Sequence, residues 1–352
     1  MNDTRHPVDL AFVHLSDIHF RKGRIGDVHD ADVEIRNELE RDLRRIRSRV
    51  SKLDGIIISG DIAFGGQVDE YTYARNWIES VREQLDCSAD GVMVIPGNHD
   101  VDRQMVPDGG DAQKLHDEIR SAATTEERNA VIATVLRDPG KGTCLMRSID
   151  AYNSFARDYG CEVSRERPYW ERDFILRDGT MLRIRGITTT FVSGPHDHVN
   201  THKMVYGGAQ LQLLREDNVR RAVVGHHPPS WTYEGDEADR ILSTMSVLQL
   251  FGHKHEQWFA RLGRGVRLIA GAMHPDRTES RWLPRYSLIT IRIASDRQIS
   301  FRIYPRRWSD EEMMFIGDFN SAGVDYRDYS AETDPALQPV VSHPRANGAE
   351  HV

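Results

Sequence analysis

Cysteine is scarce in this chain of 352 residues: Cys87, Cys144 and Cys161 stand far apart, with no C-x-x-C pair. An odd number of isolated cysteines fits reduced thiols better than a disulfide framework or a zinc ribbon. Long apolar runs are missing too, since no stretch approaches the roughly 18 uninterrupted apolar residues of a membrane span. Residues 1–6 also precede no apolar region of the kind found in a secretory signal. We therefore expect a cytoplasmic protein without a membrane partner.

An excess of positive charge is absent as well. The chain carries 46 basic and 54 acidic residues, a net charge of −8, which gives no general argument for binding nucleic acid. Only six of the basic residues are lysines, and this arginine excess keeps a nuclease among the alternatives. Histidine, in contrast, is abundant, with 16 copies. Because imidazole is both a common metal ligand and a proton shuttle, the positions of these histidines are the informative feature.

Short apolar runs alternate with amphipathic segments, which predicts an α/β fold. Strands are expected at 9–15, 55–59, 91–95, 220–224 and 247–251, a hairpin at 172–190, further strands within 266–304, and helices at 32–50, 69–85, 208–215 and 238–245. Residues 104–165 break the alternation, and there we expect an inserted segment with helices at 116–136 and 144–159. Residues 328–352 are rich in Pro, Ala, Asp and Ser and predict a poorly ordered tail.

Five short polar clusters stand at or just beyond the ends of the expected strands. They are Asp17-Ile18-His19, Gly60-Asp61, Gly97-Asn98-His99-Asp100, Gly225-His226-His227-Pro228 and Gly252-His253-Lys254-His255. In layered α/β folds the loops at the carboxyl ends of neighbouring strands meet in one crevice, so clusters distant in sequence are expected to share a site. Imidazole, carboxylate and amide ligands without thiolate favour a pair of divalent ions such as Mn, Fe or Zn.

With these five motifs in this order, D-x-H, GD, GNHD, GHH and GHxH, the chain resembles the calcineurin-like metallophosphoesterases from Leu10 to about Pro305. The resemblance implies a four-layer αββα sandwich of two mixed sheets. It also implies a catalytic domain over 1–305 and a C-terminal extension over 306–352. The insertion at 104–165 directly follows the GNHD loop, so we expect it to form a helical cap over the cleft.

The same resemblance implies the site residues. Metal ligands would be Asp17, His19 and His255 on the first ion, Asn98, His226 and His253 on the second, and Asp61 bridging both. A hydroxide bridging the two ions, which are divalent or of mixed valence, would attack phosphorus. His99 would be the general acid that protonates the leaving group, and we expect Asp100 to orient His99. His227 stays an alternative to His226.

The expected activity is hydrolysis of a small phosphodiester, such as a cyclic nucleotide or a nucleotidyl or glycerol diester. A nuclease on single strands or ends, a phosphomonoesterase and a ligand-sensing scaffold without turnover are the alternatives. Among the aromatic residues Tyr169, Trp170, Trp231, Tyr233 and Trp282, Trp231 is the best candidate for stacking on a substrate, because it follows the GHH motif closely. The physiological substrate, the metal identity and the oligomeric state do not follow from the sequence.

Overall fold

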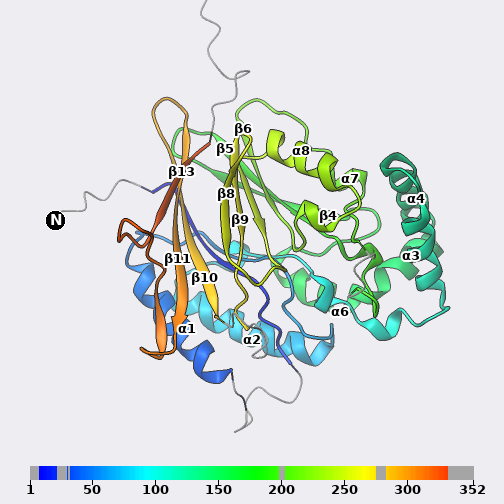
Figure 1. Cartoon of the computed structure of the whole chain (residues 1–352), viewed down its shortest axis with the longest axis horizontal. Helices are drawn as coiled ribbons and strands as arrows, with labels where there is room; N and C mark the ends of the chain where they lie inside the picture. The colour runs from blue at the N-terminus through cyan, green and yellow to red at the C-terminus, as the bar shows by residue number, and fades with distance from the viewer. Residues whose placement is uncertain (1–7, 22–29, 31, 198–202, 275–282, 332–352) are drawn as a thin grey trace, which may run out of the picture.

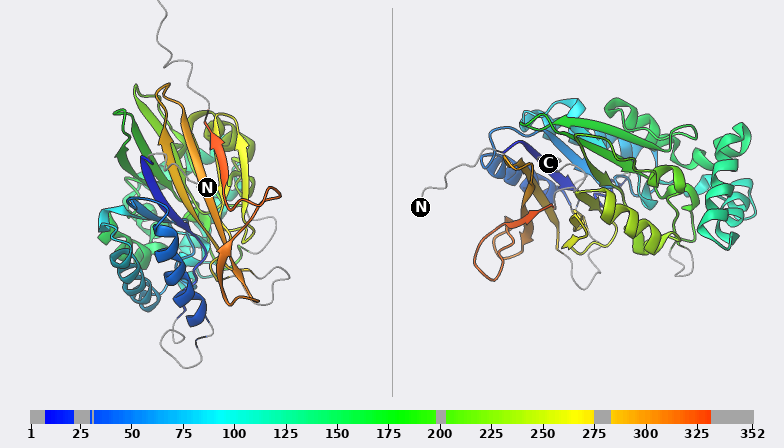
Figure 2. Two further views of the ribbon diagram at one scale, coloured as in Figure 1. Left: turned by 90° about the vertical axis from the view of Figure 1, so that its left-hand side faces the viewer. Right: turned by 90° about the horizontal axis from the view of Figure 1, so that it is seen from above.

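Two mixed β-sheets form the centre of the protein, with helices packed around them (Figures 1 and 2). The computed structural model describes residues 8–21, 30, 32–197, 203–274 and 283–331. The expected α/β sandwich of two mixed sheets is confirmed. Among the described helices, none combines the length and the apolar character of a membrane span.

The first sheet has the strand order β12-β11-β10-β1-β2-β3, with β13 also paired to β11. Its strands are β1 (Leu10–Leu15), β2 (Gly55–Ile58), β3 (Val92–Val94), β10 (Arg285–Ile293), β11 (Ile299–Ser309), β12 (Met314–Gly317) and β13 (Arg327–Ser330). Strands β1, β2 and β3 are parallel and fully buried, which explains why their sequences are continuous apolar runs. The polar clusters that follow β1, β2 and β3 therefore leave the sheet at one edge.

The second sheet has the order β4-β5-β6-β7-β9-β8. Its strands are β4 (Tyr169–Ile175), β5 (Met181–Ile187), β6 (Val219–Val224), β7 (Leu248–Phe251), β8 (Trp258–Leu262) and β9 (Gly265–Ile269). Strands β5, β6, β7 and β9 are parallel, and β4 and β5 form the hairpin expected from the sequence. Strand β8 was not expected. It pairs antiparallel with β9, and none of its five residues is fully buried, so its sequence lacks the apolar run of a buried strand.

Helices α1 (Val33–Arg47) and α2 (Val68–Gln84) connect the strands of the first sheet. Helices α7 (Gly208–Leu211) and α8 (Gly235–Met245) contribute apolar side chains to a small core with β5, β6 and β7 of the second sheet. The larger core joins the inner sides of both sheets to α1, α2 and the inserted helices. The two sheets are thereby held in a fixed relation to one another, which matters for a site that draws residues from both.

The inserted segment contains four helices rather than two: α3 (Asp111–Ser121), α4 (Thr125–Arg137), α5 (Pro139–Met146) and α6 (Asp150–Ala156). The expected helix at 116–136 is interrupted because Thr124 caps a new one: its hydroxyl accepts the Glu127 N–H at 3.1 Å in a capping box. Asp138 likewise caps α5, with a proline at its first turn.

The inserted helices pack beside the two sheets, at one end of the molecule in Figure 1. Helix α6 lies against α2, where the rings of Tyr71 and Phe155 stack at 5.1 Å. Helix α3 contacts the turn at Thr190–Val192, and Arg120 of α3 donates a hydrogen bond to the Val192 carbonyl. The expectation that these helices cap the cleft stays a prediction.

The expected boundary at residue 305 is wrong as a structural division, because it falls inside β11. This strand continues to Ser309 and pairs with both β12 and β13, so residues 306–330 complete the first sheet. The expected start of the poorly ordered tail at residue 328 is wrong, because residues 328–330 belong to β13 and pair with β11. Residues 332–352 lie outside the described residues.

Candidate metal centre

The five polar clusters meet at one edge of the two sheets, as their positions after parallel strands predict. The clusters containing Asp17, Asp61 and Asn98 follow β1, β2 and β3 of the first sheet. Those containing His226 and His253 follow β6 and β7 of the second. The site is therefore assembled from both sheets.

Asp61 lies at the centre of this site and is 1% exposed. Its Oδ2 atom is 3.3 Å from Nε2 of His19 and 3.2 Å from Nε2 of His226, so one carboxylate oxygen contacts imidazoles from both sheets. Its Oδ1 atom accepts the backbone N–H of His99 at 2.8 Å. Asp61 therefore connects loops from both sheets, and its role as a bridging ligand stays a prediction.

Asp17, His19 and His255 form one group on the side of β1. One ligand-type atom from each of the three lies within 4.8 Å of the others, and Nε2 of His255 is 3.3 Å from Oδ1 of Asp17. The other carboxylate oxygen, Asp17 Oδ2, accepts the backbone N–H of His253 at 3.3 Å. Asp17 therefore connects the two histidines of the GHxH motif.

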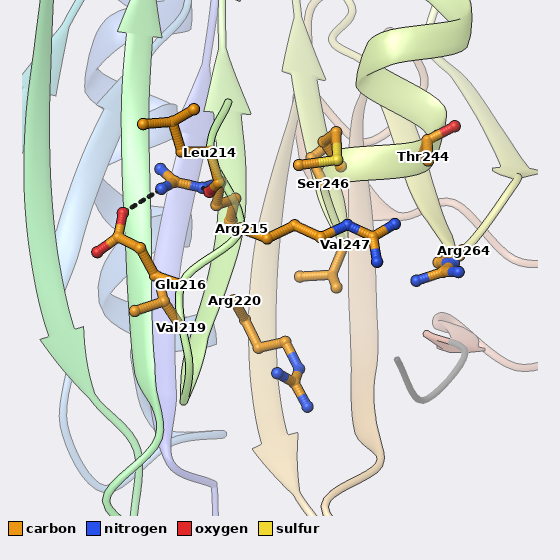
Figure 3. A pocket seen from close by; sticks show the side chains of 11 residues that line it. Leu214, Arg215, Glu216, Val219, Arg220, Thr244, Ser246, Val247 and Arg264 are labelled. Atoms are coloured by element: carbon orange, nitrogen blue, oxygen red, sulfur yellow. Dashed lines mark hydrogen bonds and ion pairs between the residues drawn. The ribbon is translucent and has the colours of Figure 1, made fainter. Parts of the chain in front are cut away.

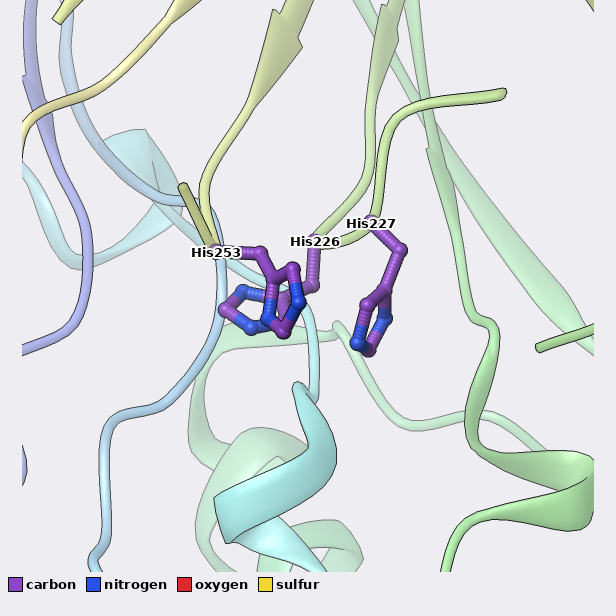
Figure 4. A group of neighbouring side chains, drawn as sticks. All are labelled: His226, His227 and His253. Atoms are coloured by element: carbon purple, nitrogen blue, oxygen red, sulfur yellow. The ribbon is translucent and has the colours of Figure 1, made fainter. Parts of the chain in front are cut away.

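His226, His227 and His253 form a second group, whose rings gather beyond the ends of β6 and β7 (Figure 4). Nδ1 of His226 is held at 2.8 Å by the Ser59 carbonyl, which directs Nε2 toward Asp61. His227 instead places Nδ1 at 2.6 Å from the Thr189 hydroxyl. Only His226 thus contacts the carboxylate expected to bridge, which favours it over its neighbour as a ligand.

Five residues of these clusters have a left-handed backbone. The φ angles are 53° at Asp17, 55° at His19, 53° at Asp61, 69° at His253 and 54° at His255. Residues other than glycine rarely adopt this region, and such strain gathers at functional sites. The backbone therefore leaves extended geometry at both D-x-H and GHxH.

Glycines next to the site have no room for a side chain. A Cβ on Gly60, whose φ is 96°, would lie 2.5 Å from Nδ1 of His226, and one on Gly97 would lie 2.2 Å from Oδ1 of Asp61. Gly60 and Gly97 thus permit the close packing of loops from the two sheets.

The residues could hold metal ions, because several buried polar atoms of the site are poorly satisfied. Within the described part of the chain, Asn98 Oδ1 and His227 Nε2 have no hydrogen-bond partner, and Asp17 Oδ1 and His226 Nε2 have only their contacts with His255 at 3.3 Å and Asp61 at 3.2 Å. Because buried polar atoms in proteins are nearly always hydrogen-bonded, this arrangement favours a bound group that accepts electron pairs from these atoms. Carboxylate, amide and imidazole donors suit Mn, Fe or Zn.

The protonation of the site follows from its burial and its carboxylates. Burial opposes the charged form of His226, but Asp61 and Asp17 outweigh it and raise its pKa to about 9. Burial also disfavours a charged Asp61, yet the neighbouring His226 and His19 hold its pKa well below the usual range. Burial lowers the pKa of His253 to about 3, with the charge of His226 adding to the effect. A metal ion that binds Nε2 of His226 would therefore compete with a proton on this imidazole.

His99 lies beside the first group, with its ring centroid 4.8 Å from that of His19. Its Nδ1 atom is 2.9 Å from the Phe64 carbonyl, so in that tautomer Nδ1–H donates and the ring orientation is fixed. His99 also forms a group with His19 and Asp61 in which a ligand atom of each lies within 4.8 Å of the others. Burial lowers its pKa.

The expectation that Asp100 orients the ring of His99 is wrong. The Asp100 carboxylate accepts backbone N–H groups of Ile62, Ala63 and Gly97 at 2.8–3.1 Å and the Tyr71 hydroxyl at 2.8 Å. The turn Asn98–Asp100 directs the two side chains apart. The group that holds His99 is the Phe64 carbonyl, and Asp100 braces the two loops that carry Asp61 and Asn98.

Sequence reasoning missed three contributors. Thr189 and the Phe64 carbonyl position His227 and His99, and neither belongs to a motif. His274 is buried, with Nδ1 2.6 Å from the Ile18 carbonyl, and its backbone N–H donates to the Asp17 carbonyl. Its position after β9 on the same sheet edge was the available signal.

The aromatic candidates separate clearly by exposure. Trp170 is buried, and its Nε1–H donates to the Val94 carbonyl at 2.8 Å, so it is a core residue. Trp231 is 43% exposed and its ring centroid lies 4.2 Å from that of His253. Trp282 lies outside the described residues. Only Trp231 of these three combines exposure with contact to the site.

A pocket rich in arginine lies at the other end of the second sheet (Figure 3). It has a volume of about 50 Å³, and its lining includes Arg215, Arg220, Arg221 and Arg264. It adjoins the first residues of β6 and β7, whereas His226 and His253 follow the last residues of these strands. The pocket is therefore separate from the histidine cluster.

A family model described as calcineurin-like phosphoesterase matches residues 10–257. A search of curated proteins finds no match. Among solved structures, purple acid phosphatase PPD1 from yellow lupin (Lupinus luteus) is 11% identical with a TM-score of 0.52. The match covers 98% of this chain and 58% of that one, so the chain spans little more than half of the lupin protein, and the likeness supports the fold alone.

Two further structures match over most of this chain. A putative 5′-nucleotidase from Staphylococcus aureus is 13% identical, with a TM-score of 0.40 and coverage of 81% of this chain and 51% of that one. Vps29 from Entamoeba histolytica, solved with zinc, is 9% identical, with a TM-score of 0.37 and coverage of 91% and 99%.

Proposed function

The chain belongs to the calcineurin-like phosphoesterase family, and from this premise we propose that it is a metal-dependent hydrolase of phosphodiesters. The observation that carries the proposal is the meeting of ligand-type atoms from both sheets at Asp61, whose Oδ2 lies 3.3 Å from Nε2 of His19 and 3.2 Å from Nε2 of His226, with Asn98 Oδ1 buried and without a hydrogen-bond partner among the described residues. Leaving a buried atom such as Asn98 Oδ1 unpaired costs about 1–3 kcal/mol, which supports a ligand that binds it.

The proposed ligands divide into two sets with a shared member. Asp17, His19 and His255 hold the first ion, Asn98, His226 and His253 hold the second, and Asp61 is common to both. The contacts of Asp61 Oδ2 with His19 and with His226 support the shared role. Manganese, iron and zinc all suit these donors.

When bound, two such ions would lower the pKa of water to near neutrality and neutralise charge on a phosphoryl group. The reaction is hydrolysis: water oxygen bonds to phosphorus, the P–O bond to one ester group breaks, and the departing oxygen takes a proton. We assign that proton to Nε2–H of doubly protonated His99, because its Nδ1–H donates to the Phe64 carbonyl. The ring centroid of His227 lies 4.2 Å from that of His253, and a contact of 2.6 Å between Nδ1 and the Thr189 hydroxyl fixes the orientation of the His227 ring.

Diesters such as cyclic nucleotides or small nucleotidyl or glycerol diesters are the proposed substrates. Exposed aromatic side chains near the site, Phe64 and Trp231, offer apolar surface to organic ester groups. The arginine pocket lies at the other end of the second sheet, so it gives no support to a basic track that would lead nucleic acid to the metals.

The test uses protein stripped of metal and reconstituted with Mn²⁺. Bis(4-nitrophenyl) phosphate, 4-nitrophenyl phosphate, a cyclic nucleotide and short single-stranded DNA are assayed in parallel, and we expect the highest kcat/KM on a small diester. Asn98→Ala should reduce bound metal from two ions per chain to one, because it removes a ligand of the second ion only. A matched change outside the site, Asn320→Ala, should keep both ions.

The same assay decides against the proposal if none of the four substrates is hydrolysed by protein that carries two ions. That result would favour a scaffold that retains the fold without turnover. Preference for DNA with steep salt dependence would instead favour a nuclease.

A further inference from the structure

Trp231 is an exposed aromatic side chain whose neighbours in the chain are mostly buried or partly buried. It is 43% exposed, whereas Pro228, Pro229 and Thr232 are buried. The backbone around it is fixed: its N–H donates to the Pro228 carbonyl at 2.9 Å, and its carbonyl accepts the Met204 N–H at 3.0 Å. A large apolar surface is thus held rigidly in solvent, which favours binding because little entropy is lost when a ligand packs on it.

The ring of Trp231 stands against the histidine cluster. It is nearly perpendicular to the ring of His253, at 82° with a centroid distance of 4.2 Å, and its centroid is 6.4 Å from that of His227. This edge-to-face packing leaves indole surface directly beside the residues proposed to hold the second ion. A phosphate ester bound there would place one of its substituents within reach of Trp231.

A second aromatic residue, Phe64, lies on the other side of Asp61 from Trp231. On one side of Asp61, ring contacts join Trp231, His253 and His226. On the other side, ring contacts join His19, His99 and Phe64, so the six rings form a row with Trp231 and Phe64 at its ends. Phe64 differs from Trp231 because its ring lies between Arg21, whose guanidinium carbon is 3.7 Å from the centroid, and His99. Both ends of the row thus carry a partly exposed aromatic side chain, but at the end of the proposed proton donor the Arg21 guanidinium already lies over the Phe64 ring.

We infer that Trp231 is a specificity-determining residue that stacks on a planar, nucleobase-like group in the ester that is not expelled from phosphorus. This inference rests on the proposed phosphodiesterase function and narrows it. The leaving group belongs beside His99, which protonates it, so the ester group beside Trp231 is the one that remains on the product. The preferred substrate class is thus a diester in which a nucleoside stays attached to the phosphate.

The experiment compares two diesters with the same leaving group. Thymidine 5′-(4-nitrophenyl) phosphate carries a planar base on the retained ester, and methyl 4-nitrophenyl phosphate carries none. Stacking of a base on an aromatic side chain, when lost by alanine substitution, corresponds to roughly 5- to 150-fold in affinity. We expect Trp231→Ala to lower the ratio of kcat/KM for the thymidine ester to that for the methyl ester by a factor in this range.

Two further variants make the comparison specific. Trp231→Phe retains an aromatic face and should restore most of the ratio, while Phe319→Ala, which removes an exposed aromatic side chain in the loop after β12, should leave it unchanged. A ratio that does not change in Trp231→Ala, including an equal loss on both esters, overturns the inference.

A binding measurement separates this inference from the proposed function. Calorimetric titration of Mn²⁺-loaded protein with thymidine 5′-monophosphate and with methyl phosphate should show weaker binding in Trp231→Ala for the nucleotide only. If wild-type protein hydrolyses neither ester, the phosphodiesterase proposal fails, but this titration still tests the stacking. Equal affinities of wild-type protein and Trp231→Ala for the nucleotide overturn the inference.

Discussion

Nε2 of His226 lies 3.2 Å from Oδ2 of Asp61, although the two residues follow strands of different sheets. This contact raises the pKa of His226 to about 9 against the effect of burial, so the imidazole of the metal-free protein is protonated at neutral pH. A metal ion that binds Nε2 must displace this proton. The contact between the sheets is therefore also a competition between proton and metal.

The first prediction concerns this competition. Between pH 6.5 and 9, release of one proton on binding makes the Mn²⁺ affinity of the metal-free protein rise about tenfold per pH unit. Calorimetric titrations in two buffers of different protonation enthalpy count the protons released. His226→Gln should release one proton fewer and bind more weakly. An affinity that is flat across this pH range contradicts the pKa shift of His226.

The second prediction concerns the proton donor. His99→Gln should lower kcat by about 10²–10⁴ on a diester with an alkoxide leaving group and by less on a 4-nitrophenyl ester, because an acidic leaving group needs little protonation. Metal content, measured by mass spectrometry, should stay at two ions per chain. Loss of an ion together with activity would show that His99 is a ligand, as its proximity to His19 and Asp61 also permits.

The third prediction separates Asp100 from His99. Asp100→Ala removes the acceptor of three buried backbone N–H groups and of the Tyr71 hydroxyl, which should cost about 3 kcal/mol or more in the free energy of unfolding. The protein that remains folded should show the wild-type dependence of rate on leaving-group pKa. Urea denaturation measures the first quantity and a series of substituted phenyl esters the second. A changed dependence would restore Asp100 as an orienting residue.

The fourth prediction uses a matched pair of glycines. Gly97→Ala places a methyl group 2.2 Å from Oδ1 of Asp61 by the present geometry, so the loop must shift, and metal affinity should fall at least about tenfold. Gly140→Ala, where the nearest atom would be 3.4 Å away, should bind metal as the wild type does. Circular dichroism should show both variants folded. Normal metal binding by Gly97→Ala would mean that the loop adapts without cost.

Much of this site was predictable because its clusters follow apolar runs that read as parallel strands. The strands ending at Leu15, Ile58 and Val94 are buried on both faces, so their sequences are distinctive and the clusters after them share an edge. The order of the five motifs then identified the family. Two-sheet topology followed from the resemblance rather than from the pattern of residues.

The orientation of side chains within the loops was not predictable in the same way. Asp100 adjoins His99 in sequence, yet the turn at Asn98–Asp100 sends its carboxylate to backbone groups of another loop. The partners that do hold His99 and His227 are a carbonyl and a threonine hydroxyl, groups that no motif marks. The insertion is divided into four helices partly by the N-caps at Thr124 and Asp138. The spacing of apolar residues, on which the helix prediction was based, does not reveal such caps.

Because the proposed metal ligands come from loops of both sheets, the geometry of the metal centre depends on how the two sheets are aligned. Sliding of one layer by about 1 Å would displace His226 and His253 relative to Asp61 and Asn98, and misplacements of that size can slow a reaction about a hundredfold. Substitutions deep in the apolar interior, far from any ligand, should therefore register as changes in catalysis even where the protein remains well folded. Substitutions meant to raise the thermal stability of this chain should therefore be placed in its outer helices, and the residues packed between the two sheets should be left unchanged.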